Sequence, residues 1–399
     1  NATGGDYIYV RKTADIAAAV AAAVADCKTY ETSDAFTTHI DGLIDAGSLT
    51  TAAQVYADHT AWQIAQADAA SSLDYTKAIR NAAVADATDW TNAGTYSGEQ
   101  YTGAPDASFI DNYGAVMDAY QTIYGLPAGK YQLKVATRAD ADNFSKVYVK
   151  SGDWEICSAR GEHVGNSGGD LGNGWSWTYV PFEITSTTDV VIGFYKDAVS
   201  WAGADDWHLY KVTANQSVDI SSAGWATLFT PYALDFSGVS GLTAYTAALD
   251  NTTVELTAVS NVPARTGVVL KGAEKTYSIP LAASSSTSQG DLKGSPTWAT
   301  DYNDSYDYYY LALDAQNKAQ FTILNSGGSI AAGKAYLVTS KSEGARVLKV
   351  VFANDISDIT TVQGEGSKVN GEYYNLSGQR VNAPQKGLYI VNGKKVIIK

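Results

Sequence analysis

The chain has 399 residues and carries 28 basic against 42 acidic side chains, a formal net charge of −14. Its length exceeds that of one compact core, so we expect about two to four domains. The hydrophobic content of 45% is that of a globular protein. Because neutralising phosphates requires clustered Lys and Arg, the acidic balance argues against nucleic acid and against an anionic membrane surface as partners. No stretch has the apolar length of a membrane span.

Residues 1–74 have the periodicity of helices. Three apolar stripes with spacings of three and four predict three short helices, which form a small bundle that must pack against another part of the chain. His59 lies on the third stripe without a partner at metal spacing, which predicts a core or surface histidine and not a metal ligand. The stripes are Ile16, Val20, Val24 and Cys27, then Phe36, Ile40, Leu43 and Ile44, then Val55, Tyr56, His59, Trp62 and Ala65.

Residues 75–213 change to a hydrophobic period of two, in short runs separated by turns. The first expected strand is Lys77–Val84 and the last is Asp206–Val212. Many short strands at regular spacing predict an antiparallel β-sandwich of the jelly-roll type. This segment holds five of the nine tryptophans, namely Trp154, Trp175, Trp177, Trp201 and Trp207.

The remaining chain predicts two more β-units. Residues 214–354 are richer in Ser, Thr and Ala, and their alternating runs predict a second β-domain. Residues 355–399 predict a small C-terminal β-domain with strands at Tyr373–Leu376, Gly387–Val391 and Lys394–Ile398. The pair Asn392-Gly393 between the last two strands is typical of a tight hairpin.

The cysteines and the first residue of the sequence give two further expectations. Cys27 and Cys157 lie in segments of different expected structure, so two buried thiols are favoured over a disulfide. The sequence begins at Asn1 with neither a Met nor an apolar leader, which predicts a processed or truncated product.

Three motifs of the sandwich segment resemble a known family. They are RNAAVADATDW (80–90), YGLPAGKYQLKVATRA (124–139) and ADDWHLYKV (204–212). Together they resemble the galactose-binding-like β-sandwich of many carbohydrate-binding modules, over about residues 75–212. The resemblance implies a jelly roll that binds a polysaccharide or other glycan.

The two C-terminal units also show resemblances. GWATLFTPYALDFSGVSGLTAYTA (224–247), VPARTGVVLKG (262–272) and IAAGKAYL (330–337) resemble a β-domain common near the C-terminus of secreted bacterial proteins. The tail YYNLSGQRVNAPQKGLYIVNGKKVIIK (373–399) resembles the sorting tails of the Por secretion system. This resemblance implies a secreted or cell-surface protein, with the secretion machinery as a partner of the tail.

Sugar binding requires an exposed aromatic ring for the apolar sugar face and polar side chains for its hydroxyls. Trp175 and Trp201 lie in or beside the Gly-rich loops GNSGGDLGNGWSW and SWAGADDW, where a core residue is less expected. Trp177 lies on a strand, where a buried position is favoured; the alternative for all three is that they fill the sandwich core. The candidate ligand-binding residues are Trp175, Trp177, Trp201, Asp170, Asn173, Asp205 and, as a weaker candidate, Tyr101.

In the resembled family a structural calcium often joins the first and last strands. The resemblance carries this site onto Asn81, Asp86 and Asp206, with Asp205 as an alternate. Calcium takes about six to eight oxygen ligands, which these side chains and backbone carbonyls would supply. Ala85 stands where the family often has an acid, and the alternative is that the Asp205–Asp206 pair solvates the entrance of a strand.

Enzyme motifs fail on their context. GNSGG (165–169) fits Gly-x-Ser-x-Gly, but no expected strand leads into Ser167 and no helix follows it. The sequence therefore predicts a mostly β, multidomain, non-catalytic carbohydrate-binding protein. Two alternatives stay open: an adhesion or scaffold protein that binds protein through a flat aromatic patch, and a glycoside hydrolase. The hydrolase requires two carboxylates about 5–9.5 Å apart in a cleft.

Overall fold

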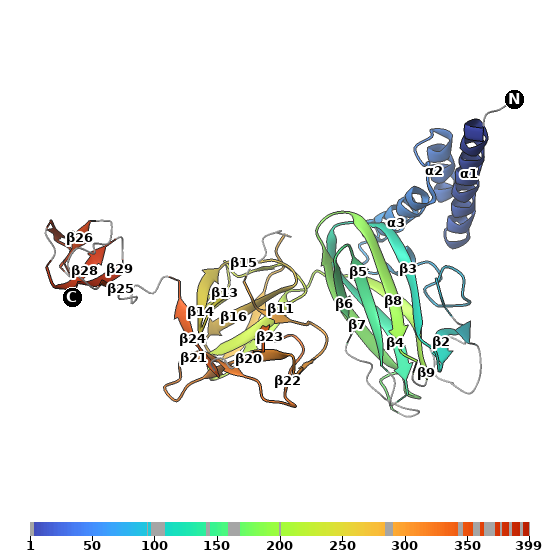
Figure 1. The fold of residues 1–399 in the computed structure, drawn as a ribbon. Helices are drawn as coiled ribbons and strands as arrows, with labels where there is room; N and C mark the ends of the chain where they lie inside the picture. The colour runs from blue at the N-terminus through green and yellow to red at the C-terminus, as the bar shows by residue number, and fades with distance from the viewer. Residues whose placement is uncertain are drawn as a thin grey trace.

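The protein is mostly β, with three helices near its N-terminus followed by a series of sheets (Figure 1). The computed structural model describes residues 4–93, 95–96, 108–140, 144–158, 168–198, 201–283, 290–341, 346–353, 360–362, 372–375, 377–382, 385–391 and 394–398. The helices lie against one end of a β-sandwich, a second β-unit follows, and a small sheet holds the C-terminus (Figure 1). None of the described helices is both long and apolar enough to cross a membrane.

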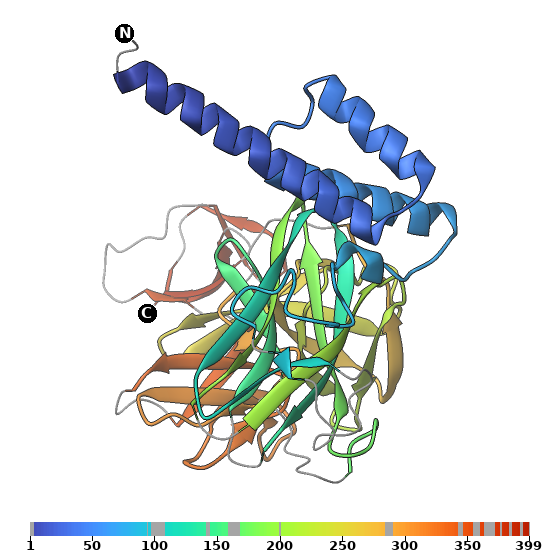
Figure 2. The same ribbon diagram turned by 90° about the vertical axis from the view of Figure 1, so that its right-hand side faces the viewer.

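The three predicted helices are present, and the first is longer than its apolar stripe. They are α1 (Gly4–Tyr30), α2 (Asp34–Asp45) and α3 (Ala52–Ala69). Figure 2 shows the N-terminal part of α1 projecting beyond the other two helices, so Ile16 is exposed although it continues the stripe. The bundle core is formed by Ala23, Cys27, Phe36, Ile40 and Val55.

Side-chain caps start the second and third helices. The Ser33 hydroxyl accepts a hydrogen bond from the backbone N–H of Phe36 at 3.2 Å, at the start of α2. Thr51 and Gln54 form a capping box at the start of α3. These bonds satisfy backbone donors that the first helical turn leaves without partners, so the local sequence sets where each helix begins.

The bundle rests on the sandwich through α3. The rings of Tyr56 and Tyr124 stack with centroids 5.5 Å apart. Gly125 has a φ of 61°, and a Cβ on it would lie 2.8 Å from the Cβ of Ala57, so only glycine fits this approach. The backbone N–H of Tyr75 also donates to the carbonyl of Leu209 at 2.7 Å. The bundle thus has the supporting partner that its small core requires.

His59 is a buried core histidine. Its Nε2 accepts a hydrogen bond from the Gln63 amide at 3.2 Å, and burial lowers its pKa from 6.5 to about 4. Between these two pKa values the unfolded chain holds a proton that the folded chain does not. We therefore expect stability to fall as the pH drops through this window, by about 3 kcal/mol from this group.

Urea unfolding at pH 7 and pH 4 measures this effect. The His59→Gln variant has no ionisable group at this position, so its stability should fall less over the same range. An equal fall in the variant and the parent chain would contradict the prediction.

The sandwich consists of two antiparallel sheets. Its core lies between them and includes Leu133, Val135, Ile192, Phe194 and Trp207. One sheet has the order β1 (Thr95–Tyr96), β2 (Phe109–Tyr113), β9 (Trp201–Lys211), β4 (Gly129–Ala139) and β7 (Ser176–Ile184). The other has the order β3 (Met117–Leu126), β8 (Thr188–Lys196), β5 (Ser145–Ser151) and β6 (Trp154–Cys157).

The predicted first strand, Lys77–Val84, is wrong. Residues Thr76–Ala78 form a short 3-10 helix, η1, and turns follow. Asn81 and Val84 have φ of 45° and 50°, which no strand residue adopts. The Asn81 amide donates to the carbonyl of Thr88 at 2.8 Å, so hydrogen bonds within the segment stabilise a loop in place of a strand.

The second β-unit is built on a nine-stranded sheet with an added set of short pairs. The sheet has the order β11 (Trp225–Thr230), β16 (Thr266–Gly272), β13 (Leu242–Asp250), β14 (Thr253–Val259), β24 (Val347–Phe352), β21 (Ala319–Ile323), β20 (Tyr306–Leu313), β23 (Ala335–Ser340) and β18 (Lys293–Gly294). The pairs are β10 (Gln216–Ile220) with β17 (Lys275–Ile279), β12 (Leu234–Asp235) with β15 (Asn261–Val262), and β19 (Thr300–Asp301) with β22 (Ser329–Ile330).

The C-terminal sheet contains the three predicted strands. In its hairpin Val391 pairs with Lys394, the register expected for a two-residue turn. The sheet has the order β25 (Thr360–Val362), β29 (Lys394–Ile398), β28 (Gly387–Val391), β26 (Tyr373–Tyr374) and β27 (Arg380–Val381). Neither Cys27 nor Cys157 forms a disulfide, and Cys27 lies in the bundle core.

Polar side chains join the sandwich to the second β-unit. The buried carboxylate of Glu183 accepts a hydrogen bond from the N–H of Ala233 at 2.6 Å and lies 3.3 Å from Lys130 Nζ. Arg265 donates to the carbonyl of Glu183 at 3.0 Å, and the Tyr232 hydroxyl donates to a sandwich carbonyl at 3.0 Å. These bonds hold the two units in one relative orientation.

Candidate functional site

Trp175 and Trp201 are buried, with 0% and 1% of their surfaces exposed. The prediction that their rings project from loops is therefore wrong. The two rings meet edge to face at 6.2 Å, and both contact Phe109. Trp201 begins strand β9 and donates from Nε1 to Asp111 at 2.7 Å. The rings form a small second core on the outer side of the sheet, with no free face for a sugar.

The polar residues predicted around those rings have structural roles. Asp205 was expected at a binding surface, but it is buried, and its carboxylate accepts a hydrogen bond from the N–H of Asp206 at 2.7 Å. Asp170 is exposed and accepts from the N–H of Trp177 at 2.9 Å. Asn173 is an exposed turn residue with a φ of 50°. Tyr101 lies outside the described residues.

Trp177 differs from its two neighbours because its ring is only half-buried. It lies on β7, at the edge of the five-stranded sheet. Lys134 Nζ lies 3.6 Å from the centre of the ring, and His208 meets the ring edge at 5.7 Å. Trp177 was expected to be buried because it lies on a strand. Of the three predicted ligand-binding tryptophans, it nevertheless has the most accessible ring.

The pairing of β4 with β7 and β9 shows which other side chains lie on the same surface as Trp177. Leu133 and Val135 point into the core, so the alternating residues of β4 point outward. Across β7, β4 and β9 the outward residues form two rows, Tyr179–Lys134–His208 and Pro181–Gln132–Tyr210. Tyr179 is 44% exposed. We call this surface the aromatic face and define it by Trp177, Tyr179, Lys134, Gln132, His208 and Tyr210.

A groove of about 510 Å³ lies beside the aromatic face. The edge strand β7 forms one wall, and Pro296 and Thr297 of the second β-unit form another. The Thr297 hydroxyl donates to the carbonyl of Cys157, so this wall is attached to the sandwich. Hydroxyl, amide, aromatic and proline side chains line the groove, and its described lining contains no carboxylate: Gln132, Thr137, Ser158, Ser176, Trp177, Thr178, Tyr179, Pro181, Pro296 and Thr297.

This arrangement has the chemistry of a sugar site. Aromatic rings contact the apolar face of a pyranose, while hydroxyls and amides exchange hydrogen bonds with its hydroxyl groups. Sequence reasoning missed Tyr179, although the alternation Trp177-x-Tyr179-x-Pro181 carries a strand period that would place the three on one face. It also missed Pro296 and Thr297, because no local pattern indicates that this loop reaches the sandwich.

The residues suggested for calcium meet only in part. Asn81 and Asp86 share one loop, in which the Asn81 amide donates to the carbonyl of Asp86 at 3.0 Å. Hydrogen bonds from Thr88 lower the pKa of the exposed Asp86 carboxyl. Asp206 lies 3.0 Å from His208 Nε2. Over the described part of the chain, no cluster of three or more His, Cys, Asp or Glu side chains fits a metal ion. These donors do not form a ready calcium cage.

Comparisons with known proteins find similar solved structures but no similar family. No protein-family model and no curated protein matches the chain. The carbohydrate-binding module TmCBM61 in complex with β-1,4-galactotriose is 16% identical, with a TM-score of 0.28 over 34% of this chain and 97% of that one.

Two further solved structures contain carbohydrate-binding modules. The CBM22-1–GH10 modules of Clostridium thermocellum xylanase 10B with xylohexaose are 17% identical, with a TM-score of 0.25 over 32% of this chain and 27% of that one. The CBM22-1–CBM22-2 tandem of Paenibacillus barcinonensis Xyn10C is 9% identical, with a TM-score of 0.25 over 66% and 82%. Because similarities with TM-scores this low carry no argument, the function of this chain has to be inferred from its own geometry.

Proposed function

We propose that the protein is a non-catalytic carbohydrate-binding protein, which holds a glycan on the aromatic face and in the groove beside it. The observation that carries this proposal is the half-buried ring of Trp177, which lies with the exposed Tyr179 at the edge of a groove lined by hydroxyl and amide groups. This surface takes the place of the Trp175 and Trp201 stacking that the sequence suggested.

The charge of the site favours an uncharged sugar. The described groove lining contains neither a carboxylate nor a cation. Lys134, on the adjoining aromatic face, offers a donor to sugar oxygens, while Gln132 offers both a donor and an acceptor. A formal net charge of −14 for the whole chain disfavours polyanionic glycans over neutral ones.

Replacing Trp177 with alanine is expected to weaken glycan binding about thirtyfold, because a central aromatic contact is worth roughly 2 kcal/mol. Affinity electrophoresis of the full chain in gels containing neutral polysaccharides, followed by calorimetry with the best ligand, measures the loss. The ring is half-buried on the outer side of the sheet and is not part of the core between the two sheets, so the fold should survive.

Tyr113→Ala is the matched control. Tyr113 is an exposed aromatic residue of the same sheet, but it lies on β2 and does not line the groove. Its removal should leave retention unchanged. Equal retention of Trp177→Ala, Tyr113→Ala and the parent chain on every polysaccharide that is bound would exclude the aromatic face as the site.

Two other functions predict different experimental results for this surface. A protein-binding adhesion module would use the aromatic residues as a flat patch, and Trp177→Ala would then weaken binding to a protein and not to a glycan. A glycoside hydrolase requires a pair of carboxylates about 5–9.5 Å apart across the cleft. Release of reducing sugar from a bound polysaccharide would favour that function.

Export from the cell and the calcium site suggested by the sequence can each be tested directly. A glycan-binding protein with a tail that resembles a sorting signal would act outside the cell, and a reporter fused to residues 355–399 should be exported by a bacterium that has the Por system. Because Asn81, Asp86 and Asp206 do not form a ready cage, calcium added to chelator-treated protein is expected to leave its melting temperature unchanged; a rise that Asp86→Asn removes would instead establish the metal site. No shift at millimolar calcium would exclude the metal site.

A further inference from the structure

The second β-unit contains a larger cavity, of about 740 Å³. It lies where the nine-stranded sheet curls until its first strand, β11, approaches β23. The N–H of Phe229 donates to the carbonyl of Gly333 at 2.8 Å, and the N–H of Ala335 donates to the Thr227 hydroxyl at 3.1 Å. The two strands meet through these bonds and not through a continuous ladder, which leaves a mouth at the seam. The mouth of a curled sheet is a common place for a ligand pocket.

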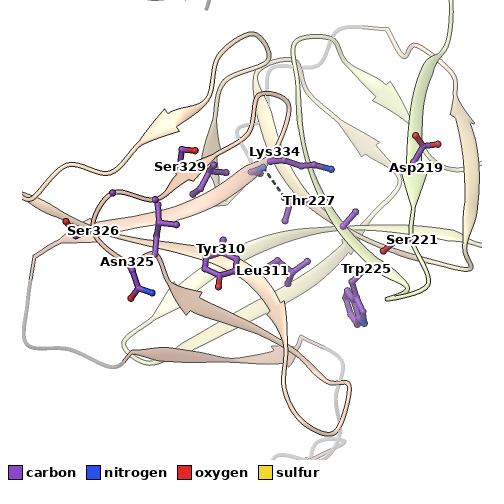
Figure 3. Close-up of a pocket in the computed structure, with 16 residues that line it drawn as sticks. Asp219, Ser221, Trp225, Thr227, Tyr310, Leu311, Asn325, Ser326, Ser329 and Lys334 are labelled. Atoms are coloured by element: carbon purple, nitrogen blue, oxygen red, sulfur yellow. Dashed lines mark hydrogen bonds between the residues drawn. The ribbon is translucent and has the colours of Figure 1, made fainter.

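Aromatic side chains form part of the wall of this cavity. Figure 3 shows Tyr310 and Leu311 between Asn325 on one side and Trp225 on the other. Tyr310 is 39% exposed and lies on β20. Trp225 is held in place by Tyr245 and by Lys271, whose Nζ lies 5.0 Å from the ring centre. Regular strands therefore present both rings to the cavity, and the contacts of Trp225 leave that side chain little entropy to lose on binding.

Polar groups face these rings. Residues 325–329, from the loop after β21 to the start of β22, supply an amide, hydroxyls and backbone groups. Lys334 is exposed across the seam, and Asp219 accepts a hydrogen bond from Thr276 at 2.5 Å. The described lining thus has one cation and one carboxylate, whose charges cancel. A balanced lining of this kind favours neither an anion nor a cation.

We infer that this cavity is a second binding site, which takes a segment of a neutral oligosaccharide or polysaccharide. Rings for the apolar sugar face and a mixed set of donors and acceptors for hydroxyls meet in one open cavity, while its balanced charge and the acidic chain disfavour nucleotides and anionic polymers. The ligand class rests on the proposed function; the site itself does not, because it shares no residue with the aromatic face.

Two sites in one chain have a measurable consequence. The bonds of Glu183 hold the sandwich and the second β-unit together, so both sites are presented at a fixed separation. A polysaccharide chain long enough to span that separation would occupy both sites, and its second contact would then form at a high effective concentration. A short oligosaccharide can occupy only one site at a time, so it should bind more weakly than the polymer.

The test uses the full chain with Tyr310→Ala, Trp177→Ala and the double variant. Affinity electrophoresis against neutral polysaccharides is the readout. Polysaccharide in the gel should still retard each single variant in part, and the affinity of Tyr310→Ala for the polymer should be about tenfold lower than that of the parent chain. The double variant should migrate as it does in a gel without polysaccharide. Tyr306→Ala is the control, because Tyr306 is an exposed tyrosine of the same strand that does not line the cavity.

The outcomes distinguish the two sites. If Tyr310→Ala and Tyr306→Ala both match their parent in the wild-type and the Trp177→Ala backgrounds, the second site is excluded while the aromatic face stands. If Trp177→Ala binds normally and Tyr310→Ala does not, the proposed function of the aromatic face fails and the second site stands. Loss of binding to an extended peptide library, without loss on polysaccharides, would overturn the assignment of a sugar ligand.

Discussion

Replacing Arg80 with alanine is expected to lower the free energy of unfolding by about 3–5 kcal/mol at pH 7, the usual cost of removing one partner from a buried ion pair. The guanidinium Nε lies 3.1 Å from Asp89 and 3.4 Å from Asp26, and the group stacks 4.1 Å from the centre of the Tyr56 ring. Asp26 is on α1, Tyr56 on α3 and Asp89 in the loop before the sandwich. One side chain therefore joins the bundle to the sandwich.

Without the guanidinium, two largely buried carboxylates would face each other. Burial and Asp89 already raise the pKa of Asp26, although Arg80 lowers it. A raised carboxyl pKa means that the native state takes up a proton more readily than the unfolded chain, so the deficit of the variant should shrink as the pH falls towards about 5.

Urea unfolding monitored by far-ultraviolet circular dichroism measures this deficit at both pH values. The control is Lys28→Ala, which breaks the exposed pair Lys28–Asp41 in the same bundle and should cost less than about 1 kcal/mol. A similar small loss for Arg80→Ala would show that the bundle does not depend on this contact.

The Glu183→Ala variant is expected to lose a comparable amount, about 3–5 kcal/mol, and to uncouple the sandwich from the second β-unit. The Glu183 side chain is fully buried, and its loss would leave the N–H of Ala233 without its acceptor. Lys130 would lose its carboxylate partner and keep its hydrogen bond to the Ala282 carbonyl at 2.7 Å. Burial lowers the pKa of Arg265 and Glu183 raises it, which places this guanidinium in the same desolvated contact.

Differential scanning calorimetry should show one coupled transition in the parent chain resolve into separate transitions in the Glu183→Ala variant. Glu155→Ala is the control, because Glu155 pairs with Lys146 at an exposed position of the sandwich and should change stability by less than about 1 kcal/mol. An unchanged single transition in Glu183→Ala would mean that other contacts hold the two units together.

The Glu183 contact also connects stability to function. The wall formed by Pro296 and Thr297 belongs to the second β-unit, whereas Trp177 belongs to the sandwich. A groove shared between two units keeps its shape only while their orientation is held. Uncoupling the units should therefore weaken glycan binding even though Glu183 does not line the groove.

Local patterns were sufficient for much of the fold. The apolar stripes predicted three helices, the period of two predicted the sheets, and Asn392-Gly393 predicted the terminal hairpin. Each of these signals depends only on residues that are close together in the sequence. The segment Lys77–Val84 was an exception. Hydrogen bonds from Asn81 and the pairing of Arg80 with Asp89 favour a loop there, and neither interaction appears in a hydrophobic period.

The exposure of the tryptophans depended on contacts distant in sequence. Trp175 is buried because Phe109 and Trp201 pack against it, and the small Ala136 leaves room for them. Trp177 keeps an accessible ring because β7 is an edge strand and the loop carrying Thr297 stands off far enough to leave a groove. A residue's own neighbours in sequence report its secondary structure; whether its ring meets protein or solvent is decided by the side chains that folding brings alongside it.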